Sequence, residues 1–319
     1  MFKQAGKLLN WMTRADMAFY LLPPLMLLLT IGTIAQKPMG LYAAQKMFFA
    51  SFIVWAGPLP LPGGYTLIGL LSLSLLAKFL LRSDWSWRRA GVNLTHLGIL
   101  ILLFGGLSAA LQSRESFMII PEGVETAYTY DYHQRILYIF ENDTLKQSIP
   151  FKKLHGKISG LPFEIEILNT CKNCNITKRT ADGEWRGMAQ FMALETKTPD
   201  KEPEADIPGL TFTINGLTPE ENGTYIAFEG MPKPVILQAG KREYKIIFGK
   251  QQDQLPFSIR LDDFKKESYP GTDKARAYSS DIVILDGGVE WPARIEMNAP
   301  LRYKGYTFYQ SSFGQSDSL

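Results

Sequence analysis

The sequence has few of the residues from which metal and catalytic sites are usually built. Its 319 residues include only two cysteines and three histidines, whereas a structural zinc site takes about four ligands. It contains no glycine-rich phosphate loop, no Gly-X-Ser-X-Gly turn, no His-Glu-X-X-His motif and no local pair of catalytic carboxylates. These absences argue against a P-loop nucleotide hydrolase, a serine hydrolase of that kind and a zinc protease.

A large excess of charge of one sign is also missing. The formal net charge is +3 at pH 7, whereas a nucleic-acid-binding protein concentrates basic residues on one face. We therefore expect no nucleic acid partner. The polarity is uneven instead, because the first third is strongly apolar and the remainder is polar and charged. This asymmetry predicts a transmembrane region over residues 1–111 and an extracytoplasmic β-rich domain over residues 112–319.

The first third contains three apolar runs that are long enough to cross a membrane. A helix rises ~1.5 Å per residue and the hydrocarbon core is ~30 Å thick. No small-residue cleavage site follows the first run, so we expect an uncleaved anchor. Pro23 and Pro24 lack the backbone N–H, and we expect them to kink this helix or to delay its start. The predicted membrane helices are Met17–Ala35, Tyr65–Leu81 and Ala90–Leu111.

A shorter apolar segment, Met47–Gly57, lies between the first two predicted spans. It is too short to cross a bilayer. We expect it to form a re-entrant or interfacial helix, with Trp55 near the lipid headgroups.

The basic residues next to the spans predict the orientation of the chain. Positively charged short loops favour the cytoplasmic side, and the two basic flanks are the N-terminal tail and the loop Arg82–Arg89. Three spans then place every residue after Leu111 outside. The basic residues of the tail are Lys3, Lys7 and Arg14.

His96 is the ionisable side chain of the third predicted span. Such a residue inside a membrane helix is costly and indicates a function, and a neutral imidazole is a common ligand of haem iron. A hydrogen bond to a neighbouring helix is the plainer alternative, and the residues alone leave both open. For His133 and His155, in the polar part, we expect ordinary surface or turn positions.

The polar part of the chain has the pattern of a β-rich domain. Short runs of β-branched and aromatic residues alternate with Gly, Pro, Asn and Asp, and no long helical pattern occurs. We expect a β-sandwich or an open barrel. The predicted strands are Arg135–Phe140, Phe163–Leu168, Leu210–Gly216, Thr224–Gly230, Glu243–Gly249, Phe257–Leu261 and Asp281–Leu285.

An internal echo indicates two related β units. His155–Leu168 and Phe248–Leu261 share a Gly-Lys pair, a Leu-Pro-Phe triplet and the alternation that follows it. Chance similarity between strand-like sequences is the alternative.

Cys171 and Cys174 form a Cys-X-X-Cys pair in the polar part. Three interpretations are open: a redox-active or thiol-exchanging pair, a local structural disulfide, or half of a metal site. Residue 175 is Asn, which excludes covalent haem attachment through Cys-X-X-Cys-His.

Five segments together resemble one known family, the ResB-type cytochrome c biogenesis proteins of System II. Three of the segments lie in the membrane half and two in the polar half, and the last two mix aromatic, acidic and turn residues in a fixed order. The segments are Ile31–Gln36, Leu41–Trp55, Thr95–Gly106, Leu255–Thr272 and Ala299–Phe313.

The resemblance implies a function in haem handling. Family members form a complex with a CcsA-type membrane protein, carry haem b across the bacterial inner membrane and deliver it to the thiols of apocytochrome c. The family histidine of the third membrane helix corresponds to His96, which is expected to give the haem iron one axial ligand while the partner gives the other. The covalent step is expected to lie in the partner, so the resemblance does not make this chain an enzyme by itself.

The sequence also departs from the family pattern, which has a fourth membrane helix after the Tyr-Gln-Ser-Ser segment. No such span precedes Leu319, and this leaves partner docking and C-terminal topology open. The family assigns no general role to Cys171 and Cys174. A membrane-anchored thiol-redox protein acting through that pair, and a ligand-free membrane scaffold, are therefore the alternative functions.

Overall fold

The computed structural model describes residue 13, residues 16–180 and residues 183–311. The chain divides into two compact units. The first comprises Met1–Arg114 and Thr196–Asp206, and the second comprises Glu115–Glu195 and Ile207–Leu319. The basic residues of the tail (Lys3, Lys7 and Arg14) and the end of the Ala299–Phe313 segment lie outside the described residues.

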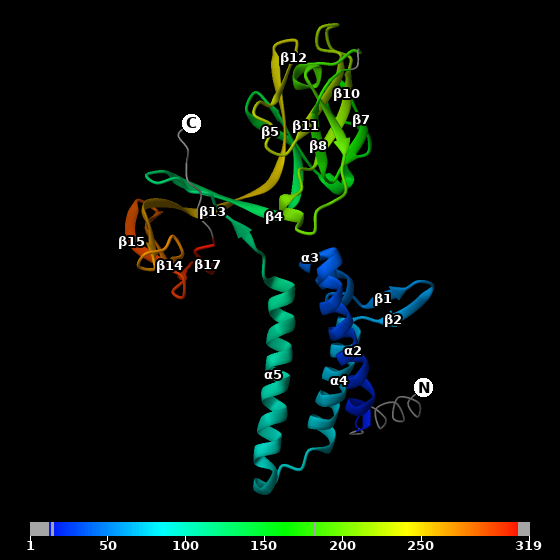
Figure 1. The fold of residues 1–319 in the computed structure, drawn as a ribbon, viewed down its shortest axis with the longest axis vertical. Helices are drawn as coiled ribbons and strands as arrows, with labels where there is room; N and C mark the ends of the chain where they lie inside the picture. Colours follow the sequence, from blue (N-terminus) through cyan, green and yellow to red (C-terminus); the bar gives the residue numbers. More distant parts are fainter. Residues whose placement is uncertain (1–12, 14–15, 181–182, 312–319) are drawn as a thin grey trace. The chain divides into compact units, whose positions relative to one another are not determined.

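The first unit contains three helices that are long and apolar enough to cross a membrane: α2 (Asp16–Met39), α4 (Gly64–Arg82) and α5 (Ala90–Gln112) (Figure 1). The three predicted spans are thus confirmed as helices. α2 begins at Asp16, before Pro23 and Pro24, so the prolines do not delay its start. α4 packs against both α2 and α5.

The short helix expected over Met47–Gly57 is wrong for most of its length. A helical turn α3 (Leu41–Ala44) continues into a π-helical turn η1 (Gln45–Phe49), and the chain then forms a hairpin of β1 (Ile53–Ala56) and β2 (Leu59–Pro62). The reason is local. Ile, Val and Trp favour strands, and Gly57, with φ 63°, supplies the positive φ that a two-residue hairpin turn needs at its first position.

A small apolar core joins this connection to the helices. Val54 of β1 is buried together with Leu28 of α2, Phe48 of η1 and Leu67 of α4. The hairpin is therefore fixed to the helices at one point, while most of its other side chains remain exposed.

The second unit is built almost entirely from strands, as predicted. Its short helical turns are η3 (Phe151–Lys153) and η4 (Gly187–Gln190), while η2 (Trp87–Arg89) and η5 (Pro203–Ala205) belong to the first unit. The strands are β3 (Ser116–Phe117), β4 (Glu125–Glu141), β5 (Thr144–Pro150), β6 (Gly156–Ile158), β7 (Glu164–Cys171), β8 (Cys174–Lys178), β9 (Met192–Thr196), β10 (Gly209–Asn215), β11 (Gly223–Phe228), β12 (Val235–Ala239), β13 (Arg242–Ser268), β14 (Ala275–Asp286), β15 (Val289–Glu296), β16 (Leu301–Tyr303) and β17 (Tyr306–Phe308).

Two antiparallel sheets carry most of these strands. A seven-stranded sheet runs β15-β14-β13-β4-β3, with β12 added to β13 and β5 added to β4. A four-stranded sheet runs β11-β10-β7-β6. β8 pairs with β9 and β16 pairs with β17.

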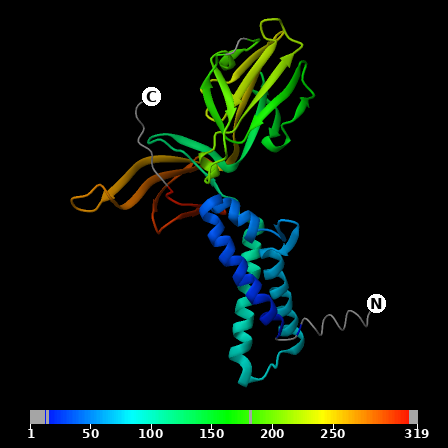
Figure 2. The same ribbon diagram turned by 45° about the vertical axis from the view of Figure 1, so that its right-hand side comes forward.

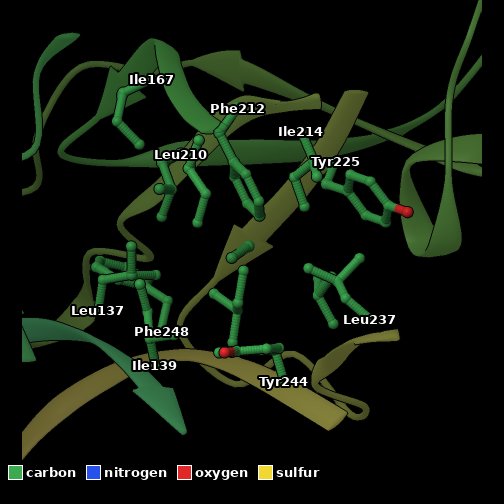
Figure 3. Close-up of a cluster of buried hydrophobic side chains, with 14 of the residues drawn as sticks. Leu137, Ile139, Ile167, Leu210, Phe212, Ile214, Tyr225, Leu237, Tyr244 and Phe248 are labelled. Carbon is green, nitrogen blue, oxygen red and sulfur yellow. The ribbon is translucent and has the colours of Figure 1, made fainter. Parts of the chain in front are cut away.

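The main core lies between the two sheets. In Figure 3, side chains of the four-stranded sheet, including Leu210 and Phe212, point toward Leu137 and Tyr244 of the seven-stranded sheet. All four are almost completely buried, and burying a large apolar side chain stabilises a fold by ~1.5–3 kcal/mol. The alternation of inward apolar and outward polar residues that predicted these strands thus builds a sandwich around one core.

A second core forms farther along the same long strand. β13 has 27 residues and pairs with β4 through two register shifts. Its first half contributes Tyr244 and Phe248 to the main core, and its second half contributes Phe257 and Ile259 to a separate cluster with β14 and β15. One strand therefore contributes side chains to two separate apolar clusters.

Candidate functional site

His96 lies near the start of α5 and its side chain is half-buried. Among the described residues, the ring has no hydrogen-bond or ion-pair partner. The hydroxyl of the neighbouring Thr95 donates to the carbonyl of Gly91 at 3.0 Å. Because that hydroxyl already donates its proton to the helix backbone, it does not donate to the His96 ring. Both imidazole nitrogens are thus without a polar partner among the described residues.

A hollow of about 300 Å³ lies beside this position, between the end of α4 and the start of α5. It is mainly apolar and aromatic, and α5 contributes residues three or four apart, which share one face of a helix. His96 does not line the hollow, because it precedes Leu97 by one residue and so lies about 100° around the helix. The lining residues are Phe79, Trp85, Ser86, Trp87, Ala90, Asn93, Leu94 and Leu97.

The loop that closes this hollow is held by Asp84. Its backbone carbonyl accepts a hydrogen bond from Asn93 at 2.8 Å, and its carboxylate accepts one from the Ser86 N–H at 3.1 Å. Arg89 lies 3.5 Å from the same carboxylate. These contacts fix the start of α5, which carries His96, against the connection from α4.

One face of α5 is open to a neighbouring molecule. A Cβ atom added to Gly91, Gly98, Gly105 or Gly106 would meet nothing within 4 Å. Small residues allow membrane helices to approach closely. Within the first unit, α5 packs on α4 and leaves this glycine face uncovered.

The membrane unit of the chain contains one imidazole and no thiol. His96 is the only histidine among residues 1–114 and 196–206, and these residues include no cysteine. No group of three or more His, Cys, Asp or Glu side chains that could hold a metal ion occurs in the described part of the chain. A second imidazole, or a thiolate, for a metal ion on His96 would therefore have to come from outside this unit.

Cys171 and Cys174 are joined by a disulfide at the turn between β7 and β8. Both residues are buried. The N–H of Cys174 donates to the carbonyl of Ile207 at 2.8 Å, and the Asn173 side chain accepts from the Ile207 N–H at 3.3 Å. This environment favours a structural disulfide, since a thiol-exchanging sulfur must be accessible. The redox role stays a prediction.

The other two histidines lie in the second unit, where both are exposed. The backbone N–H of His133 donates to Asp131 at 2.7 Å. His155 follows the turn η3. Their surroundings fit the surface positions expected for them.

A buried charge cluster in the second unit has no counterpart among the predicted site residues. Arg135 donates from Nε to Glu229 at 2.7 Å and from Nη1 to the carbonyl of Tyr132 at 2.5 Å. Lys250 lies 3.3 Å from the other oxygen of Glu229. The inward register of Arg135 with Leu137 and Ile139 was the available signal, but the sequence does not indicate its partner, which lies 94 residues away.

A second charge cluster lies on the exposed side of β13, β14 and β15. Arg294 binds Asp281 with two hydrogen bonds, at 2.6 and 2.9 Å. These bonds and the nearby Lys265 lower the pKa of Asp281 to about 2. The cluster ties three adjacent strands together.

Comparisons with known proteins each match part of the chain. Residues 221–319 match the ResB-like family. Protein NrfI of Wolinella succinogenes is 34% identical over 74 residues, a match that covers 23% of this chain and 8% of NrfI. The segments Leu255–Thr272 and Ala299–Phe313 lie within residues 221–319, so the predicted resemblance of this part is confirmed.

Proposed function

Because residues 221–319 are ResB-like, we propose that this chain is a membrane-anchored protein of cytochrome c biogenesis. In this proposal it is a subunit of a System II cytochrome c synthase and takes part in moving haem b across the membrane and delivering it to apocytochrome c. The ResB-like match is the observation that carries the proposal. The three apolar helices of the first unit supply the membrane anchor that such a role needs.

In the proposed complex, His96 is an axial ligand of the haem that is being transported. Its support is the ring's position in a membrane helix without a hydrogen-bond partner among the described residues, where an unpaired polar group is costly. Haem iron would relieve that cost by binding one ring nitrogen.

A CcsA-type membrane protein is the proposed partner. The membrane unit of this chain has a single imidazole and no thiolate, so a bis-histidine haem would take its second imidazole from another unit or molecule. The uncovered glycine face of α5 gives a partner helix room to approach. The covalent attachment to apocytochrome c then belongs to the partner.

The proposed location is the bacterial inner membrane, with the second unit in the periplasm. The end of α4 and the loop that follows it contain Arg82, Arg88 and Arg89. These basic residues favour the cytoplasm, and one crossing by α5 takes the chain to the other side. The disulfide of Cys171 and Cys174 also favours an oxidising compartment. Reporter fusions within Arg82–Arg89 and after Leu319 test this orientation: a cytoplasmic signal at Leu319 would contradict it.

The proposal as a whole is tested by purifying the full chain from membranes and recording its absorption spectrum with whatever co-purifies. A Soret band together with a co-purifying membrane protein is the expected result. A preparation free of haem and of partner, from cells that make cytochrome c, would contradict it.

A further inference from the structure

The hairpin β1–β2 has the composition of a segment that contacts lipid. No Asp, Glu, Lys, Arg or His occurs between Lys46 and Lys78. The hairpin also exposes large apolar side chains on both strands, namely Phe52, Ile53, Trp55, Leu59 and Leu61. In a water-exposed loop such a cluster is unusual.

The hairpin is held at the membrane boundary by the helix that follows it. α4 starts at Gly64 and has 19 residues, a length of about 28 Å at 1.5 Å per residue, close to the thickness of the hydrocarbon core. Its first residues therefore lie at the boundary. The N–H of Tyr65 donates to the carbonyl of Ser51 at 3.1 Å and the Thr66 hydroxyl donates to that of Phe52 at 2.6 Å, so the hairpin base lies at the same depth.

The orientation of the hairpin also fits a position at the membrane boundary. Figures 1 and 2 show it projecting sideways from α2 and α4 instead of continuing along their axes. Val54 packs into the small core among the helices. The exposed side chains therefore extend along the membrane surface.

The free edge of β2 is also suited to an apolar environment. The N–H of Gly63 donates to Phe52 at 2.9 Å, and donors alternate sides along an antiparallel strand. The backbone nitrogens of residues 60 and 62 therefore face the free edge, and both residues are proline. An unpaired N–H is costly in lipid, and this edge has none at these positions because proline has no N–H.

From these observations we propose that the β1–β2 hairpin is a lipid-contacting element. It inserts its apolar side chains into the interface of the membrane leaflet opposite the Arg82–Arg89 loop. Trp55 is the anchor at headgroup depth, since tryptophan is enriched there. The occupant of this surface is the bilayer itself, and the proposal does not depend on the function of the chain.

The test uses the full-length protein in vesicles of phosphatidylcholine and phosphatidylglycerol. Trp55→Cys carries an environment-sensitive fluorophore, and the natural cysteines are not labelled because they form a buried disulfide. Trp291→Cys on β15 is the matched control, because Trp291 is 53% exposed and Trp55 is 58% exposed. Leu59→Cys on the opposite strand is the second variant, which covers the case that Trp55→Cys does not fold.

Nitroxide-labelled lipid should quench the fluorophore at positions 55 and 59 several-fold more strongly than at position 291, and iodide in the water should show the opposite order. Strong iodide quenching at positions 55 and 59 would overturn the proposal by placing the hairpin in water. A fluorophore that neither agent quenches would also overturn it, because the hairpin would then be covered by protein.

Discussion

Arg135 and Glu229 form a charge pair in the interior of the β-rich unit, with Nε and the carboxylate oxygen 2.7 Å apart and the Arg135 side chain 6% exposed. Lys250 approaches the same carboxylate. One partly buried anion therefore compensates two cations. The three residues come from β4, β13 and the position after β11.

The first prediction concerns this compensation. Glu229→Gln leaves Arg135 and Lys250 without their anion and should destabilise the protein by about 3–5 kcal/mol. Arg135→Met should cost clearly less, because Glu229 keeps Lys250 as its partner. Thermal unfolding of the full chain in detergent measures both variants. Equal losses, or a larger loss for Arg135→Met, would show that the carboxylate does not balance both cations.

The two cores give the second prediction. Phe163 and Phe257 occupy the same place in the two Leu-Pro-Phe triplets, both are 5% exposed, and they lie in different cores. Replacing either by alanine should cost about 3–5 kcal/mol. Hydrogen exchange should accelerate mainly in β10 for Phe163→Ala and mainly in β14 for Phe257→Ala. Phe191→Ala, at an exposed position, is the control and should change little. Identical exchange patterns for the two variants would mean that the cores unfold as one.

Acid should weaken the strand pairing around β14, because Asp281 has a lowered pKa of about 2. A carboxylate with a depressed folded-state pKa adds stability above its unfolded value of about 3.9 and loses it as the pH falls through the folded value. The contribution should therefore disappear between about pH 4 and pH 2. Asp281→Asn should remove this part of the pH dependence while leaving the stability near pH 2 almost unchanged, as followed by denaturant unfolding across that range. An unchanged acid profile in this variant would rule out Asp281 as the group.

Much of this architecture could be predicted from local patterns, and the exceptions have physical causes. The spans follow from length and hydropathy, and the strands follow from alternation, because both signals lie within a few neighbouring residues. The hairpin β1–β2 was missed because the periodicity of a short apolar run such as Ile53–Ala56 does not distinguish a helix from a strand, although its residue types favour a strand. The ion pair between Arg135 and Glu229 was missed because neither segment by itself indicates which distant residue it will lie against in the fold. For His96 the residue type indicates a function, but the sequence does not show which group the imidazole binds.

The disulfide should matter for stability and not for haem. The double variant Cys171→Ser, Cys174→Ser removes a disulfide between residues with a sequence separation of 3. For such a short loop, the chain-entropy model gives a loss of only about 2 kcal/mol in the free energy of unfolding. The haem spectrum should stay that of the unaltered protein, since neither cysteine lies in the membrane unit. Loss of the haem band in this double variant would mean that the site has been misassigned, and a maturation defect with normal haem would instead favour a thiol function.

We propose that His96 binds haem iron inside the membrane. The most direct measurement is the haem content and absorption spectrum of the purified complex with His96→Ala, compared with His133→Ala and His155→Ala as matched histidine controls in the second unit. Alanine keeps a membrane helix intact, so the chain should still insert and hold its partner. The haem content should fall, or the haem should change spin state, only in the His96 variant. Added imidazole should partly restore the haem content and spectrum by occupying the vacated axial position. Wild-type haem content and spectrum in His96→Ala would contradict the claim and would leave His96 as a polar contact between helices.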